Sequence, residues 1–124
     1  RDGRIVRSAG VGCRRNGWPT RRRDPAHACE AIRRGCRVIL SPKQYCYLDY
    51  SQTADPVRYE PLCHDMRYVP LRQVYRLEPF DRLRPEERSQ VLGVQGNVWT
   101  EYMPDMECVE FMILPRLAAL AEVG

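Results

Sequence analysis

The sequence predicts an α/β fold, in which short strands alternate with helices, and three observations carry this prediction. A helix signal at 26–34 is followed by a β-branched apolar run at 36–40, which is half of a βαβ repeat. A second apolar run lies at 91–98, and apolar residues recur at helical spacing over 106–123. Two strands cannot form a stable parallel sheet that is covered on both faces. We therefore expect the chain to be the last part of a larger domain.

The first helix and strand have clear boundary signals. Asp24 and Pro25 suit the N-cap and the first helical position, and Gly35 is a residue that commonly ends a helix. The strand that follows should end at Ser41-Pro42, because proline has no N–H to donate to a strand ladder.

The later elements are less regular. Residues 43–70 contain five tyrosines but no helical or strand periodicity, and such a long aromatic segment favours a packed functional loop. Short helical segments are expected at 70–77 and 84–88. Pro115 lies inside the last helical pattern and should kink it or divide it into two helices.

Length and composition limit the class of protein. A chain of 124 residues forms at most one small domain. Its apolar fraction of 44% and mean hydropathy of −0.54 suit a soluble globular protein rather than a disordered one. No apolar run approaches the ~20 residues of a membrane span, so we expect no membrane association. No targeting signal is evident, and the sequence leaves the compartment open.

Residues 1–23 read as an irregular basic arm, without helix or strand periodicity. Residues 1–37 hold 11 arginines against three acidic residues, whereas the remainder is acidic overall. Two hypotheses account for this arm: a natural basic tail, or a frame error or truncation scar in a GC-rich gene. A nucleic-acid partner is not expected, because no aromatic interleaving or recognisable binding module accompanies the arginines.

The cysteines do not indicate a metal or redox site. None of the six belongs to a C-x-x-C pair, and adjacent Cys63 and His64 have poor geometry for binding one metal. We interpret Cys46, Cys63 and His64 as structural, leave disulfides open, and expect neither a metal nor another cofactor.

A sugar-binding pattern follows the second strand. Trp99 comes directly after the apolar run, and Glu101 follows two residues later. In parallel α/β folds, ligand-binding side chains gather where the strands end. An indole face can cover the C–H face of a pyranose, and a carboxylate can accept hydrogen bonds from its hydroxyls. The alternative interpretation is a core tryptophan beside a solvated glutamate.

Three separated motifs resemble one family, and the first of them joins Ser41-Pro42 to Tyr47-Leu48-Asp49. Ser41-Pro42, Tyr47-Leu48-Asp49, the stretch from Gly93 through Trp99-x-Glu101, and the stretch 114–122 (LPRLAALAE) resemble the family-20 β-N-acetylhexosaminidases. The resemblance covers roughly residues 26–124. It implies the last two βα units of a TIM (β/α)8 barrel, with 36–41 as strand seven, 91–98 as strand eight, and 24–124 as the family's part of the chain. No family match is expected for 1–23.

The resemblance also implies an activity. These enzymes remove terminal β-linked N-acetylhexosamine, GlcNAc or GalNAc, from glycans or chito-oligosaccharides. The substrate's own acetamido oxygen attacks the anomeric carbon, so the enzyme needs no nucleophile. In the family, an Asp-Glu pair orients the acetamido group and supplies the general acid/base. This chain contains no Asp-Glu dipeptide, and the surroundings of Trp18 do not match the family's other tryptophans. The general acid/base is therefore expected upstream, in the remainder of the barrel.

Four residues match family positions with roles. By resemblance, Tyr47 donates to the acetamido oxygen, Asp49 binds sugar hydroxyls in the −1 subsite, Trp99 forms the floor of that subsite, and Glu101 binds the hydroxyls of the non-reducing end. Each residue also has a purely structural alternative. Tyr47 would be a packed aromatic residue and Asp49 a turn residue. Trp99 would be a core residue and Glu101 a solvated carboxylate. Arg116 is interpreted as an ion-pair residue on a helix face, without an assigned role.

Three functions remain open from the sequence. The chain is part of an active hexosaminidase, or a catalytically incomplete remnant or sugar-binding fragment, or an interaction protein with a basic arm. We expect the isolated chain to be inactive, because it lacks the acid pair.

Overall fold

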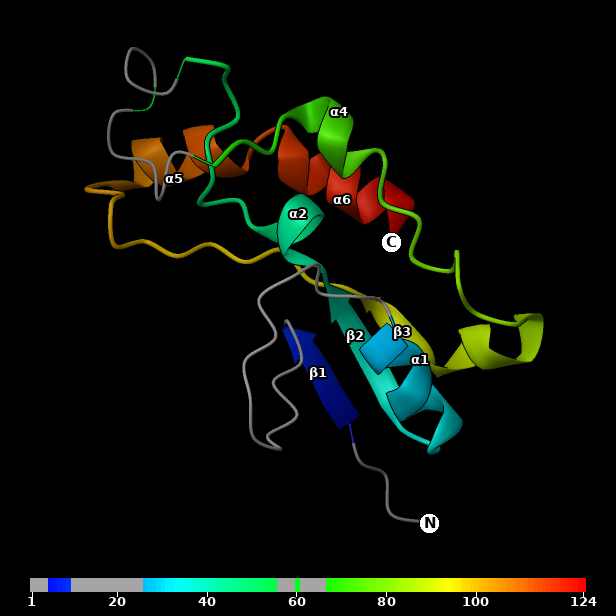
Figure 1. The fold of residues 1–124 in the computed structure, drawn as a ribbon. Helices are drawn as coiled ribbons and strands as arrows, with labels where there is room; N and C mark the ends of the chain where they lie inside the picture. Colours follow the sequence, from blue (N-terminus) through cyan, green and yellow to red (C-terminus); the bar gives the residue numbers. More distant parts are fainter. Residues whose placement is uncertain (1–4, 10–25, 56–59, 61–66) are drawn as a thin grey trace.

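The computed structural model describes residues 5–9, 26–55, 60 and 67–124. Three strands form one sheet, and α1 lies against it, whereas α2, α4, α5 and α6 gather beyond one end of the sheet (Figure 1). The elements are β1 (Ile5–Ala9), α1 (Ala26–Arg33), β2 (Arg37–Ser41), α2 (Lys43–Cys46), α4 (Leu71–Val74), the 3-10 helix η2 (Pro85–Gln90), β3 (Val91–Val94), α5 (Met106–Ile113) and α6 (Arg116–Val123).

The sheet is parallel throughout and has the order β1-β2-β3. Val6 pairs with Val38 on the central strand, and Leu40 pairs with Val94 on the other side. The expectation of an irregular arm is therefore wrong for residues 5–9. That pentapeptide has no strand periodicity of its own, and its extended form is stabilised by pairing with β2. The rest of the predicted arm, with Trp18, lies outside the described residues.

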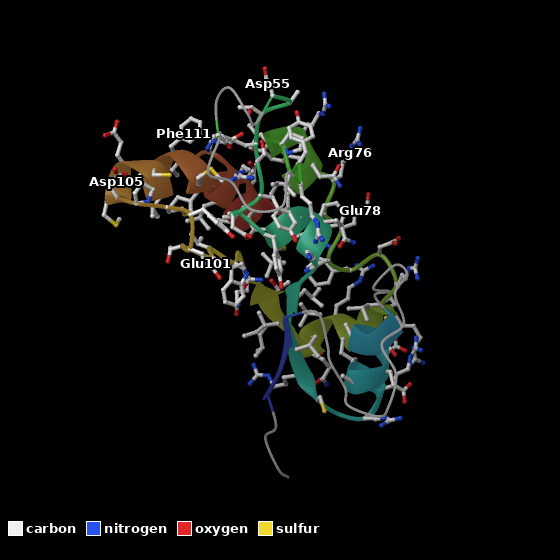
Figure 2. All side chains as sticks on the ribbon, turned by 60° about the vertical axis from the view of Figure 1, so that its left-hand side comes forward. Asp55, Arg76, Glu78, Glu101, Asp105 and Phe111 are labelled. Carbon is white, nitrogen blue, oxygen red and sulfur yellow. The ribbon has the colours of Figure 1, made fainter. Side chains whose placement is uncertain are left out.

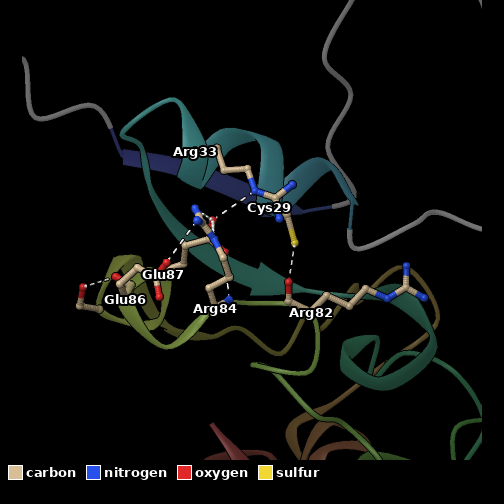
Figure 3. A network of polar contacts seen from close by, with 7 residues as sticks. Cys29, Arg33, Arg82, Arg84, Glu86 and Glu87 are labelled. Atoms are coloured by element: carbon tan, nitrogen blue, oxygen red, sulfur yellow. Dashed lines mark hydrogen bonds and ion pairs between the residues drawn. The ribbon is translucent and has the colours of Figure 1, made fainter.

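The first core packs α1 against the sheet. Cys29 and Ile32 on α1 meet Val38 on β2 and Leu83 before η2, and all four are buried. Polar contacts at the rim join the same elements (Figure 3): Glu87 on η2 accepts hydrogen bonds from Arg84, which directly precedes η2, and from Arg33 on α1. The predicted helix–strand pair is thus confirmed as one packed unit.

The second core lies beyond the sheet, where α6 packs against the loop after β2 and against α4. Its buried members are Cys46, Tyr50, Val69, Val74, Leu77, Ala119 and Leu120. The last helical pattern is divided at the cis peptide bond between Leu114 and Pro115, so α5 and α6 are separate helices, as the proline predicted.

The second predicted strand is shorter than expected. It was predicted for 91–98, but β3 ends at Val94. The reason lies in its neighbour, because β2 ends at Ser41 and the chain then turns into α2. After Gln95, whose N–H donates to the carbonyl of Leu40, the following residues have no β2 backbone to pair with. They extend instead toward the loop that carries Tyr47.

In the part of the chain that the structure describes, no helix has the length and apolar character needed to cross a membrane.

Candidate functional site

The candidate site lies where β2 and β3 end, at the edge where a parallel α/β fold presents ligand-binding residues. Asn97 brackets Tyr47 through the backbone. Its N–H donates to the carbonyl of Cys46 at 2.7 Å, and its carbonyl accepts from the N–H of Leu48 at 2.8 Å. These two hydrogen bonds form a parallel bridge between Tyr47 and Asn97. Because Trp99 follows Asn97 by two residues, the bridge holds Tyr47 close to Trp99.

The side chain of Asn97 anchors this bridge to both strands. It is buried, and its Nδ2 donates to Ser41 Oγ at 2.8 Å, while its Oδ1 accepts from Gln95 Nε2 at 2.9 Å. Ser41 in turn donates to the carbonyl of Gln95 at 2.7 Å. The ends of β2 and β3 are thus joined by a closed set of hydrogen bonds, none of which sequence reasoning predicted.

The two aromatic residues of the prediction come together. The ring centroids of Tyr47 and Trp99 lie 6.5 Å apart, with their planes tilted by 48°. Trp99 is 50% exposed, which excludes the alternative of a core tryptophan. Tyr47 also contacts the ring of Tyr50, and the ammonium group of Lys43 lies over both tyrosines, 5.7 and 5.3 Å from their ring centroids. The guanidinium of Arg67 also lies over the Tyr50 ring, 5.4 Å from its centroid, so the aromatic cluster is bordered by cations.

Asp49 lies deeper than the aromatic pair. It is only 3% exposed, which argues against its being a solvated turn residue. Its charge acts on Arg116, whose guanidinium is also buried. A carboxylate held this deep keeps its charge only where cations or hydrogen-bond donors compensate for lost water.

Arg116 is the residue that the sequence interpretation missed. It is completely buried, and it donates to four backbone carbonyls, those of Leu48, Tyr50, Val69 and Met112. Burial lowers the pKa of Arg116 to about 10, although the charges of Glu60 and Asp49 raise it, so the guanidinium stays protonated at neutral pH. A signal existed in the sequence. Met112, Arg116 and Leu120 recur at four-residue steps, which places the arginine in the middle of the apolar stripe.

A second buried carboxylate, that of Glu60, binds the loop after β2 at residues 51–53. Glu60 accepts hydrogen bonds from the hydroxyls of Ser51 and Thr53 and from the N–H groups of Gln52 and Thr53. Burial raises the pKa of Glu60, but these hydrogen bonds outweigh burial and leave the pKa below its usual value. The described part of this loop around Ser51, Gln52 and Thr53 is therefore packed and hydrogen-bonded.

Glu101 stands apart from the other predicted site residues. It is exposed on the segment between β3 and α5 (Figure 2). Within the described ranges, no hydrogen bond or ion pair joins it to Tyr47, Asp49 or Trp99. Its predicted role stays a prediction.

The thiols behave as structural groups where they are described. Cys46 is fully buried, and burial raises its pKa to about 12, so it is neither a nucleophile nor a ready ligand at neutral pH. Cys63 and His64 lie outside the described residues. In the described part of the chain, no three His, Cys, Asp or Glu side chains gather in a way that could hold a metal ion.

The fold and this site define a class: a segment of a parallel α/β protein that presents an exposed indole, a phenol and a buried carboxylate at the ends of two adjacent strands. Such a surface offers stacking to a sugar ring and hydrogen bonds to its polar groups. Comparison with known proteins places the chain within this class.

The sequence model described as glycosyl hydrolase family 20, catalytic domain, matches residues 11–124. The chain belongs to this family. The match extends into residues 11–23, where no family match was expected. The fold is accordingly the C-terminal part of a TIM (β/α)8 barrel, as the resemblance predicted.

Individual relatives agree with this assignment. A β-hexosaminidase of Vibrio furnissii is 36% identical over 99 residues, a match that covers 78% of this chain and 16% of that protein. A β-N-acetylhexosaminidase of Cellulomonas fimi is 36% identical over 101 residues, covering 82% of this chain and 20% of that protein. The crystal structure of a family-20 exo-β-N-acetylglucosaminidase from Vibrio harveyi, in complex with N-acetylglucosamine, matches with a TM-score of 0.65 at 28% identity, over 81% of this chain and 16% of that one. The chain thus spans a fifth or less of the length of these relatives.

Proposed function

We propose that this chain supplies the C-terminal part of the −1 subsite of a β-N-acetylhexosaminidase. The whole enzyme would hydrolyse terminal non-reducing β-linked GlcNAc or GalNAc in glycans or chito-oligosaccharides. The observation that carries the proposal is the approach of Tyr47 to Trp99 at the ends of β2 and β3, with ring centroids 6.5 Å apart. It is supported by relatives that are named for this activity.

The reaction is proposed to be substrate-assisted. The acetamido oxygen of the sugar attacks the anomeric carbon while the glycosidic bond breaks, and the leaving oxygen takes a proton from the general acid in the remainder of the barrel. The resulting cyclic oxazolinium is opened by water, which gives a proton back to that group and adds to the anomeric carbon with retention of configuration. The hydroxyl of Tyr47 donates a hydrogen bond to the acetamido oxygen and holds it for attack. A phenol suits this task because it donates to a group whose charge is changing without itself carrying a charge at neutral pH.

The other site residues bind the sugar. The exposed indole of Trp99 is the floor on which the pyranose rests. Asp49 accepts hydrogen bonds from sugar hydroxyls, and Glu101 does the same at the non-reducing end. The general acid/base and the carboxylate that orients the acetamido group come from the remainder of the barrel.

The test is a fusion in which residues 24–124 replace the matching segment of the Cellulomonas fimi relative. We expect the fusion to hydrolyse 4-nitrophenyl N-acetyl-β-glucosaminide but not the corresponding glucoside, whose 2-hydroxyl cannot form the oxazolinium. Tyr47→Phe removes one hydroxyl and should lower kcat by roughly 10²- to 10³-fold, the cost of one lost transition-state donor. Tyr45→Phe, on α2 two residues before Tyr47, is the matched control and should leave kcat within about twofold.

Two results would refute the proposal. One is a folded fusion that does not release nitrophenol. The other is an equal effect of Tyr47→Phe and Tyr45→Phe.

A second candidate function is favoured by one observation, the lack of any Asp-Glu dipeptide in the chain. In that case the chain is a catalytically incomplete remnant or a sugar-binding fragment, in which Tyr47, Asp49 and Trp99 bind a sugar without hydrolysing it. Titration of the chain itself with N-acetylglucosamine, followed by indole fluorescence, would detect this binding. Loss of the signal in Trp99→Phe would assign it to the site.

A further inference from the structure

We propose that Arg116 is the positioning residue of the loop that carries Tyr47 and Asp49, and that it sets the place of Asp49 by fixing the backbone on both sides of it. The proposal goes beyond the sugar-binding residues themselves, because Arg116 is buried and acts through the loop rather than on a substrate. Its consequence for catalysis rests on the proposed function.

The hydrogen bonds of Arg116 flank Asp49 in the sequence. Nη2 donates to the carbonyl of Leu48 at 2.7 Å, and Nη1 donates to the carbonyl of Tyr50 at 2.8 Å. These carbonyls belong to the residues immediately before and after Asp49. A planar guanidinium presents its N–H groups in a rigid fork, so two carbonyls bound to one fork are held at a fixed spacing.

The same guanidinium ties this loop to two other segments. Nη1 also donates to the carbonyl of Val69 at 2.9 Å, before α4, and Nε donates to Met112 at 3.1 Å, at the end of α5. Arg116 is thus the common partner of three segments that are distant in sequence. A buried carbonyl that loses its donor is costly, so losing Arg116 would release the loop as a unit.

Burial makes this role specific to arginine. The side chain is 0% exposed, and hydrogen bonds of a charged donor to buried carbonyls are stronger than neutral ones. Lysine has the same charge, but its three N–H groups diverge from a single nitrogen and cannot match the fork. Asn97 already brackets Tyr47 in the analogous way, through the carbonyl of Cys46 and the N–H of Leu48. The two polar residues together fix the whole stretch 46–50.

The first test measures amide hydrogen exchange in the full 124-residue chain. In Arg116→Lys, we expect the amides of Leu48, Ser51 and Val69, which are hydrogen-bonded in and beside the loop, to exchange at least tenfold faster. The amide of Gln95, bonded to β2, should change less than twofold. The matched control is Arg33→Lys, which alters an arginine on α1 that binds Glu87, far from the loop. It should leave the three loop amides unchanged.

The second test is a double-mutant cycle in the fusion enzyme described above. If Arg116 acts through Asp49, Arg116→Lys should lower kcat/KM about tenfold in the parent but less than twofold in an Asp49→Asn background. Ile32→Ala creates a cavity in the core between α1 and the sheet and controls for a general loss of stability. It should lower the Tm, and its effect on kcat/KM should be the same with and without Asp49→Asn.

The outcomes separate the two proposals. A parent fusion without activity refutes the proposed function, and amide exchange then still decides the role of Arg116. Equal acceleration at Leu48, Val69 and Gln95 would show that Arg116 stabilises the fold generally and would overturn the inference. An equal loss of kcat/KM with and without Asp49 would overturn it as well.

Discussion

Replacing Asn97 with alanine should loosen Tyr47 from its place beside Trp99 while leaving α1 and its core intact. The substitution leaves the backbone groups that bridge Asn97 to Cys46 and Leu48, but it removes the side chain that anchors this bridge to the strand ends. Asn97 is 8% exposed, and its amide makes two hydrogen bonds, to Ser41 and from Gln95.

The magnitude follows from these contacts. Each hydrogen bond contributes ~0.5–1.5 kcal/mol net, and Ser41, which is buried, loses a donor that water cannot easily replace. We expect a loss of about 2 kcal/mol in the free energy that opposes local opening. Because 1.4 kcal/mol corresponds to a factor of ten in an equilibrium constant, the amide of Leu48 should exchange about 30-fold faster.

The assay is amide exchange of the 124-residue chain, comparing Leu48 with amides of α1. Ser89→Ala is the control, because Ser89 makes one long hydrogen bond of 3.4 Å on the exposed surface of η2. Its loss should change the exchange rate neither of Leu48 nor of the α1 amides. Exchange of Leu48 within twofold of the parent would refute the reasoning, since the side chain of Asn97 would then not hold the bridge.

Three further predictions concern stability and reactivity. The pKa of Glu87 is lowered from 4.5 to about 2, mainly by the hydrogen bond from Arg84. The contribution of Glu87 to the stability of the fold should therefore be complete above about pH 5 and be lost as the pH falls toward 2. The Tm of Glu87→Gln should accordingly depend less on pH over that range. Gly96→Ala places a Cβ 3.2 Å from Leu48 Cδ1 and Leu120 Cδ2, so we expect a loss of roughly 1–3 kcal/mol in chemical denaturation; an unchanged midpoint would mean that these methyl groups can move aside. The thiol of Cys46 should resist iodoacetamide at pH 8 in the native chain and react once the chain is unfolded, because burial raises its pKa to about 12; alkylation of Cys46 in the native chain, detected by mass spectrometry, would contradict this.

The sequence predicted those parts of the fold that depend on local signals. The helix after Asp24-Pro25, the strand that ends before Pro42, and the division of the last helix at Pro115 each depend on the chemistry of one or two residues. Trp99 was expected at the site because strand ends of parallel sheets gather ligand-binding residues, whereas Tyr47 was expected there only through the family resemblance.

The misses share a different cause. β1 is extended because it pairs with β2, from Ile5 opposite Arg37 to Ala9 opposite Ser41. The pentapeptide itself has no strand periodicity, and the two β-branched residues at its start are a weak signal. β3 stops early because its neighbour turns into α2. Both outcomes are decided by partners distant in sequence, which periodicity within a window cannot detect.

Arg116 shows how such a nonlocal feature can still be anticipated. A long loop that packs its aromatic residues inward must also bury backbone carbonyls, and each of those needs a donor. A helix that crosses the loop can supply donors only from its apolar face, so a cation in that stripe is the expected solution. Arg116 stands between Met112 and Leu120 in the sequence pattern and is the first residue of α6. Its fork has enough N–H groups for carbonyls from three segments. An arginine inside an apolar helical stripe, in a chain with a long aromatic loop, is therefore better interpreted as the support of that loop than as part of the helix surface.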